Sequence, residues 1–116
     1  MRVVGPSMTP TLSDGALVWV HECAYPRRRP HRGEIVAARP ASLAGQACVK
    51  RVAGVPGDAV VVRGMTKQLG QDEYFLLGDQ ASESLDSRHF GVVVAHELMG
   101  SVWRRSKHQS QQEGAR

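Results

Sequence analysis

The sequence predicts an all-β fold, a small antiparallel β-sandwich or partly closed barrel with little or no helix. Glycine and proline punctuate the chain at intervals of roughly eight to twelve residues, and short runs rich in β-branched side chains lie between them. No apolar stripe with helical spacing continues for a useful length, and no segment is repeated. The chain has 116 residues, of which 41% are hydrophobic, so it fits one compact domain with a small core. We expect that domain to cover residues 1–105.

Each expected strand is a short apolar or β-branched run with a turn former at one end. In chain order, the strands are expected at residues 2–4, 15–21, 34–39, 48–52, 59–63, 73–77 and 99–104. The turn signal Ser13-Asp14-Gly15 opens the second strand, and Arg32-Gly33 opens the third. A tight turn over residues 54–58 separates the fourth strand from the fifth.

The remaining segments read as connections. Residues 26–32 are expected to be an extended loop, because two prolines bracket three arginines. Residues 64–67 fit either a hairpin turn or a short return strand, and residues 95–98 fit one helical turn. Polar and charged residues dominate from 106 onward, so residues 106–116 are predicted to be a disordered tail.

The formal net charge is +4, and much of the excess lies in two arginine clusters, at residues 27–32 and 104–107. Such clusters can face nucleic acid or anionic lipid headgroups. A solvated loop and a solvated tail are the favoured interpretation. Aromatic residues make up 5% of the chain and do not alternate with the basic ones, which argues against single-stranded nucleic acid as a partner.

Cysteine content and hydropathy bear on the cellular compartment. The two cysteines, Cys23 and Cys48, stand beside apolar residues, so small buried thiols are favoured over a disulfide. No run reaches the ~18 apolar residues that span a bilayer, and no leader-like segment is present. We therefore expect either a soluble protein or one whose membrane anchor preceded Met1.

Ser7 and Lys50 carry the strongest chemical signal. Ser7 follows Gly5-Pro6 in a turn after a short strand, so its hydroxyl is expected to be accessible. A serine is a poor nucleophile until a base takes its proton, and a buried lysine can be that base because burial favours the neutral amine. Strand alternation alone leaves two faces open: either Lys50 points inward and Arg51 outward, or the reverse.

A third segment, from Gly78-Asp79 to Gly91, holds polar residues that could position such a pair. Asp86 and Arg88 are two residues apart, so in an extended stretch they would share one side and could fix the loop that carries Ser84. The alternative is a polar loop rich in turn formers.

Three motifs together resemble the type I signal peptidase family of Ser/Lys leader peptidases. They are Gly5-Pro6-Ser7-Met8-x-Pro10-Thr11-Leu12, Val49 to Asp58, and Gly78-Asp79 through Ser84-x-Asp86-Ser87-Arg88-x-Phe90-Gly91. They occur in the family's order between about Val3 and Trp103, nearly the whole domain. One such motif would be a weak signal, whereas three in order are a specific one.

The resemblance implies the antiparallel β-fold of the signal peptidase catalytic domain and an endopeptidase that removes leader peptides from exported precursors. Ser7 would be the nucleophile and Lys50 the general base, with no cofactor and no metal. Backbone amides at Ser7 and Met8 would bind the oxyanion; Gly5 stands where some members have a hydroxyl donor. The expected supporting residues are Ser84, Asp79, Asp86 and Arg88.

This sequence departs from the family at three points. Gln80 stands where asparagine usually follows Gly-Asp, the segment between Asp58 and Glu73 is too short for the inserted subdomain of some members, and no membrane anchor is present. A precursor's leader peptide and a membrane surface are the expected partners, and the protein is expected to be a monomer. It would lie on the extracytoplasmic face of a membrane if an anchor precedes it, or in the cytoplasm if the chain is complete.

Several alternatives remain open. One is a maturation protease dedicated to a single partner, of the kind that trims the leader of nickel superoxide dismutase. Another is a catalytically inactive β-module that binds peptides or membranes. A third, which also pairs serine with lysine on a β-domain, is a self-cleaving repressor. Weaker ones are a Ser/His/Asp triad using Asp86 and His89, and a metal site from His21, Cys23 and His31.

Overall fold

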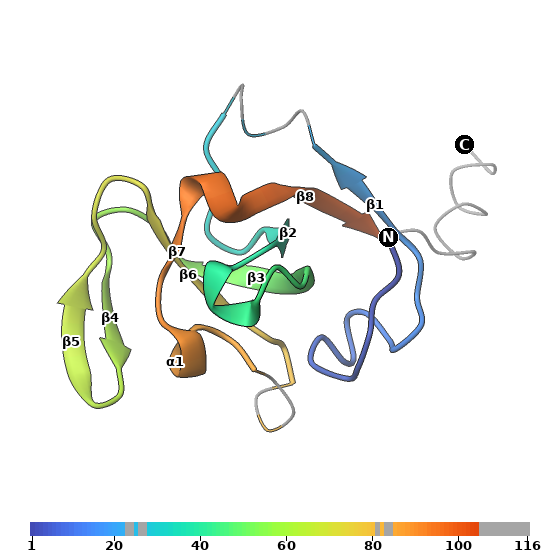
Figure 1. Ribbon diagram of the computed structural model, residues 1–116, viewed down its shortest axis with the longest axis horizontal. Coiled ribbons are helices and arrows are strands. Elements are labelled where there is room, and N and C mark those ends of the chain that lie inside the picture. Colours follow the sequence, from blue (N-terminus) through green and yellow to red (C-terminus); the bar gives the residue numbers. More distant parts are fainter. Residues whose placement is uncertain (23–24, 26–27, 81, 83–84, 105–116) are drawn as a thin grey trace.

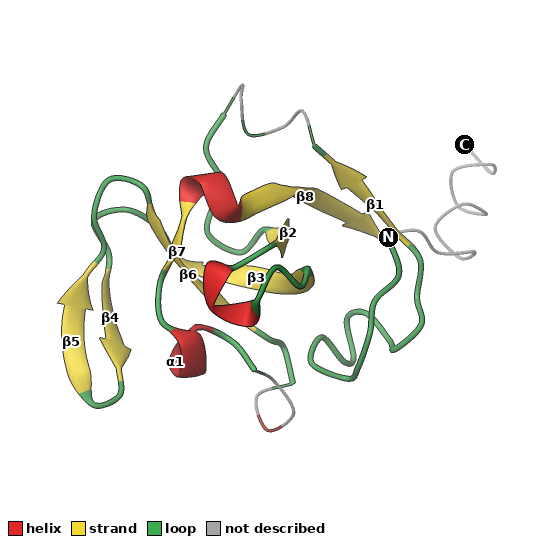
Figure 2. Cartoon of the chain, viewed as in Figure 1, coloured by secondary structure: helices red, strands yellow, loops and turns green. Residues whose placement is uncertain are grey.

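The computed structural model describes the whole chain except residues 23–24, 26–27, 81, 83–84 and 105–116. Antiparallel strands dominate it and helices are short, which confirms the predicted fold class (Figure 2). The strands are β1 (Val18–His21), β2 (Ile35–Ala38), β3 (Cys48–Gly54), β4 (Ala59–Val62), β5 (Met65–Gln68), β6 (Glu73–Leu77), β7 (Val93–Val94) and β8 (Leu98–Arg104). The helical segments are α1 (Ser87–Phe90), η1 (Ala41–Leu43) and η3 (Ala95–Glu97).

Six strands form one antiparallel sheet in the order β1-β8-β2-β3-β6-β7. Strand β3 lies inside this sheet, paired with β2 on one side and β6 on the other. Strands β4 and β5 form a separate hairpin that projects to one side of the molecule (Figure 1). Residues 64–67 are therefore part of a turn and return strand, one of the two forms expected for them.

Several element predictions need correction. Residues 2–4 form no strand: Arg2 makes a single bridge to Leu17. The two-residue strand β7 is too short to leave a periodic signal. Helix α1 was not predicted. It begins at a capping box, in which the Asp86 side chain accepts from backbone N–H groups of the first turn and the His89 side chain accepts from the Asp86 N–H. The helical turn expected at residues 95–98 is present as η3, whereas the predicted tail, 106–116, lies outside the described residues.

Two clusters of buried apolar side chains form the core, and β3 contributes to both. One cluster contains Val36, Ala38, Val52, Tyr74, Leu76, Val93 and Leu98. The other packs the amino-terminal segment onto the sheet and contains Val3, Met8, Leu12, Val18 and Val49. The two clusters lie on different sides of β3, so Val49, Lys50 and Val52 are all buried, whereas Arg51 stays partly exposed.

Two arginines of the arginine-rich loop form ion pairs with neighbouring carboxylates. Arg28 makes a bidentate ion pair with Glu34, and Arg32 makes one with Asp58. The Arg28 guanidinium also lies 5.5 Å from the centre of the Tyr25 ring. Burial and the bond from Tyr25 to Glu34 raise the pKa of that phenol, so Tyr25 remains neutral. These pairs favour the interpretation of the segment as a structured loop.

None of the helices in the described part of the chain has the length and apolar composition that a bilayer span requires.

Candidate active site

Ser7 lies on a loop whose neighbouring residues are anchored in the core. Met8 and Leu12 are almost completely buried, so the chain on the carboxyl side of the serine is fixed by packing. On the other side, Gly5 adopts φ +86°, a left-handed conformation that favours glycine, and its N–H donates to Asp14 Oδ1 at 2.9 Å. The loop thus presents a half-buried Ser7 beside the sheet.

Lys50 reaches Ser7 from the middle of β3. Its Nζ lies 2.9 Å from Ser7 Oγ, and the residue is only 4% exposed. Burial lowers the pKa of the amine, with a further lowering effect from Arg88, while Cys48 and Asp86 act in the opposite direction. Strand alternation left open whether Lys50 or Arg51 points inward, and in the structure Lys50 does. The arrangement places an amine with a reduced proton affinity against a single hydroxyl.

Cys48 lies on the same side of β3 as Lys50 and is a free thiol. Burial raises its pKa, so the thiol stays protonated at neutral pH. Cys23 lies outside the described residues. Cys48 is therefore a partly buried thiol, less buried than the sequence predicted.

Asp79 binds a partner that the sequence did not indicate. The Arg51 guanidinium donates to both of its carboxylate oxygens, at 2.9 and 2.8 Å, and lowers its pKa. Thr11 Oγ1 donates to the same carboxylate at 2.5 Å. Arg51 and Thr11 were not predicted as site residues. The only available signal was that Arg51 must face the opposite side of the strand if Lys50 faces inward.

Asp86 and Arg88 pair, but not in an extended stretch as predicted. Asp86 is the N-cap of α1 and is fully buried, and Arg88 donates to it from Nε at 3.0 Å and from Nη2 at 2.8 Å. The Gly78 N–H donates to the same carboxylate at 2.9 Å. The turn of helix α1 thus brings the Asp86 and Arg88 side chains together, as the predicted extended stretch would also have done. Ser84, the expected orienting serine, lies outside the described residues.

The other site hypotheses gain no support from the geometry. For the Ser/His/Asp triad, His89 Nδ1 lies 3.7 Å from Asp86 Oδ1, but the His89 side chain is half exposed on α1. The Ser7 hydroxyl is instead hydrogen-bonded to Lys50. Among the residues described, no three or more His, Cys, Asp or Glu side chains are grouped to hold a metal ion, the neighbourhoods of His21 and His31 included.

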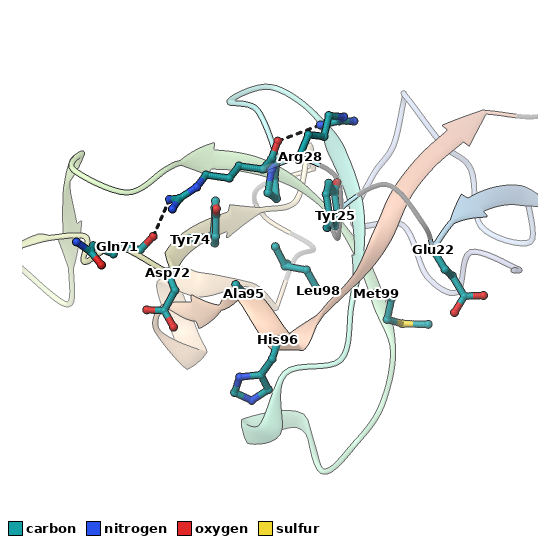
Figure 3. A pocket seen from close by; sticks show the side chains of 12 residues that line it. Glu22, Tyr25, Arg28, Gln71, Asp72, Tyr74, Ala95, His96, Leu98 and Met99 are labelled. Atoms are coloured by element: carbon teal, nitrogen blue, oxygen red, sulfur yellow. Dashed lines mark hydrogen bonds between the residues drawn. The ribbon is translucent and has the colours of Figure 1, made fainter.

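A small cavity of about 80 Å³ opens beside Ser7. Its walls are the amino-terminal segment and the start of β3: Met1, Arg2, Val3, Val4, Ser7, Ala47, Cys48, Val49 and Lys50. A larger cavity, about 500 Å³, lies elsewhere, between the loop after β1 and the start of β8 (Figure 3). Tyr25, Tyr74 and Leu98 line that cavity, and neither Ser7 nor Lys50 does. Volume therefore does not identify the reactive site here, whereas side-chain chemistry does.

Comparisons with known proteins agree with these observations. The family model described as "Signal peptidase, peptidase S26" matches residues 1–69 and 62–105. A mitochondrial ATP-independent inner membrane protease subunit 1b of Arabidopsis thaliana is 33% identical over 110 residues, covering 86% of this chain and 65% of that protein. A probable signal peptidase I-2 of Synechocystis is 31% identical over 125 residues, covering 84% of this chain and 57% of that protein. The chain thus spans roughly three-fifths of the length of these two relatives.

A crystal structure of a signal peptidase I from Enterococcus faecalis has the same fold. It aligns with a TM-score of 0.54 at 24% identity and covers 64% of this chain and 97% of that one. The family match covers nearly all of the described residues and includes the loop of Ser7 and the strand of Lys50. The chain therefore belongs to the signal peptidase family, peptidase S26, a family of serine endopeptidases.

Proposed function

We propose that this protein is a serine endopeptidase of the signal peptidase I type, which removes amino-terminal leader peptides from exported precursors with Ser7 and Lys50. One observation carries the proposal: a buried lysine amine lies 2.9 Å from the hydroxyl of Ser7. The burial that lowers the pKa of Lys50 also makes a neutral amine available to accept a proton.

In the proposed reaction, Ser7 Oγ attacks the scissile carbonyl carbon while its proton passes to the neutral Lys50 amine. The resulting ammonium then protonates the departing amine as the peptide C–N bond breaks, leaving an acyl ester on Ser7. Water attacks this ester while giving a proton to Lys50, and the resulting ammonium returns that proton to Ser7 Oγ as the acyl–oxygen bond breaks. Each step uses the same base, so no cofactor is required.

The Ser7 and Met8 amides are the proposed oxyanion donors. In the part of the chain that the structure describes, neither N–H donates a hydrogen bond. Backbone donors held rigidly in this way stabilise the charge that develops on the carbonyl oxygen. The packing of Met8 supports this role, because it holds the peptide unit between the two residues in place.

Substrate selection is proposed to depend on the small cavity beside Ser7. At about 80 Å³, it is far smaller than the hundreds of Å³ of an ordinary ligand pocket, so it would admit only a small side chain before the scissile bond. Because a backbone segment and a strand form its walls, the leader would bind in an extended form with main-chain hydrogen bonds.

The test is cleavage of synthetic leader peptides that end in Ala-x-Ala, measured by mass spectrometry in detergent. Wild-type protein should cut after the last alanine, and Ser7→Ala should reduce kcat by roughly 10³-fold or more. Cleavage of one precursor alone among many would indicate a dedicated maturation protease instead. Absence of cleavage by the wild type, in both detergent and lipid, would leave a binding module.

A membrane surface is the proposed second partner, consistent with relatives whose names place them in the inner membrane. Trp19 and Trp103 are directly opposite each other on β1 and β8, and they are 62% and 58% exposed. Tryptophan favours the interface between headgroups and acyl chains. We expect a Trp19→Ala/Trp103→Ala double variant to bind lipid vesicles at least about tenfold more weakly in sedimentation. Met65→Ala, which removes an exposed apolar side chain on the hairpin, is the matched control and should bind as the wild type does.

A further inference from the structure

Adjacent residues of β3 make contacts on opposite sides of the strand. Lys50 points inward and reaches Ser7, whereas Arg51 binds Asp79 through both carboxylate oxygens. Arg51 also donates to the Gly33 carbonyl at 2.8 Å, which fixes its guanidinium against the turn before β2. The strand that carries the amine therefore also holds the carboxylate of Asp79 in one position.

That carboxylate is in turn bonded to the loop of Ser7. Thr11 Oγ1 donates to Asp79 Oδ2, and the next residue along the chain, Gln80, donates from its N–H to the Ser7 carbonyl at 2.7 Å. Within the loop, the Leu12 N–H donates to the Met8 carbonyl at 2.8 Å, so Thr11 and Ser7 belong to one compact turn. Two bonds thus connect the turn to residues 79–80.

The Ser7 loop lies outside the six-stranded sheet, so the packing of Met8 and Leu12 and these two bonds hold it against the sheet. The nearest strand-like backbone pairing joins residues 1–3 to residues 15–18 and ends at Val3, four residues before Ser7. No ladder of strand pairing therefore sets the distance between Ser7 Oγ and Lys50 Nζ. A displacement of about 1 Å between reacting groups can reduce the rate by roughly 10²-fold.

We propose that Thr11 is a positioning residue, whose hydroxyl holds the nucleophile loop in register with Lys50 through Asp79 and Arg51. This inference rests on the proposed Ser7/Lys50 function and adds a residue to it. Thr11 contacts neither substrate nor reacting atoms. It acts by keeping Ser7 Oγ within reach of the Lys50 amine, which lies on β3 next to Arg51.

The kinetic test compares Thr11→Val, which keeps the shape and loses the hydroxyl, with Thr11→Ser, which keeps the hydroxyl. We expect Thr11→Val to lower kcat by roughly 10- to 100-fold, with KM changed by less than about threefold, and Thr11→Ser to recover most of the loss. Thr9→Val is the matched control on the same loop, because the Thr9 side chain makes no hydrogen bond in the described structure. Equal kcat values for Thr11→Val and Thr9→Val would overturn the proposal.

Amide hydrogen exchange gives a second readout that needs no catalysis. Thr11→Val should speed exchange at the Gln80 and Leu12 amides while leaving Val36 and Leu76 in the core unchanged. Faster exchange throughout the core would mean that Thr11 is merely stabilising, and unchanged exchange at Gln80 would mean that it holds nothing; either result overturns the proposal. If wild-type protein cleaves no leader, the proposed function fails, whereas the exchange pattern still decides whether Thr11 holds the loop.

Discussion

Replacing Lys50 by arginine should abolish turnover. A guanidinium retains its proton throughout the accessible pH range, so it cannot accept the proton of Ser7. We expect kcat for leader cleavage to fall by roughly 10³-fold or more, a loss typical of removing a general base whose only task is proton transfer. Lys50→Met should lose as much activity, because it removes the amine and nearly preserves the volume. If a variant unfolds at a temperature close to that of the wild type, its loss of kcat comes from the missing base and not from unfolding.

The pH profile of the wild-type enzyme provides the second half of this prediction. Burial lowers the pKa of Lys50 below its usual value near 10.4. The protonated form cannot act as a base, so kcat/KM should be low in acid and rise as the pH passes through the lowered pKa of the folded enzyme. A rate that stays flat from about pH 5 to 10, with chemistry limiting, would contradict the role of Lys50. Substantial turnover by Lys50→Arg would contradict it as well.

The sequence singled out Ser7 and Lys50 as candidates but could not orient the Lys50 side chain. Strand alternation could not decide between Lys50 and Arg51, because alternation distinguishes faces only when one face is in water. In β3, Val49 and Lys50 are both buried, since one core cluster covers each side of the strand. The inward position of Lys50 depends on pairing with β2 and β6, which no local pattern encodes.

Contacts between segments far apart in the chain could not be predicted from the sequence either. Asp79 was grouped with Asp86 and Arg88 because they share one motif, yet its partner is Arg51, 28 residues away. Bonds of that kind follow from the packing of the whole sheet. The expected strands, by contrast, depend on local turn chemistry, and most of them occur close to their predicted positions.

Asp86 should be the most sensitive position for stability. Its side chain is completely buried, and it accepts hydrogen bonds from the Gly78 N–H, the Arg88 N–H and the Arg88 guanidinium. Asp86→Ala would leave those donors unpaired and remove the cap of α1, so we expect the free energy of unfolding to fall by about 2–4 kcal/mol in urea titrations.

Two comparison variants make the origin of that loss measurable. Asp86→Asn keeps one acceptor oxygen, enough for either the Gly78 N–H or the Arg88 N–H but not both, and it loses the ion pair, so its loss should be smaller than that of alanine but still measurable. Asp58→Ala removes a partly exposed carboxylate that pairs with Arg32 and accepts from the Val55 N–H, and its effect should be smaller than that of Asp86→Ala, because water screens the pair and only one backbone donor is lost. If Asp86→Ala and Asp58→Ala were equally mild, the buried carboxylate would not be what holds Gly78 and α1 together.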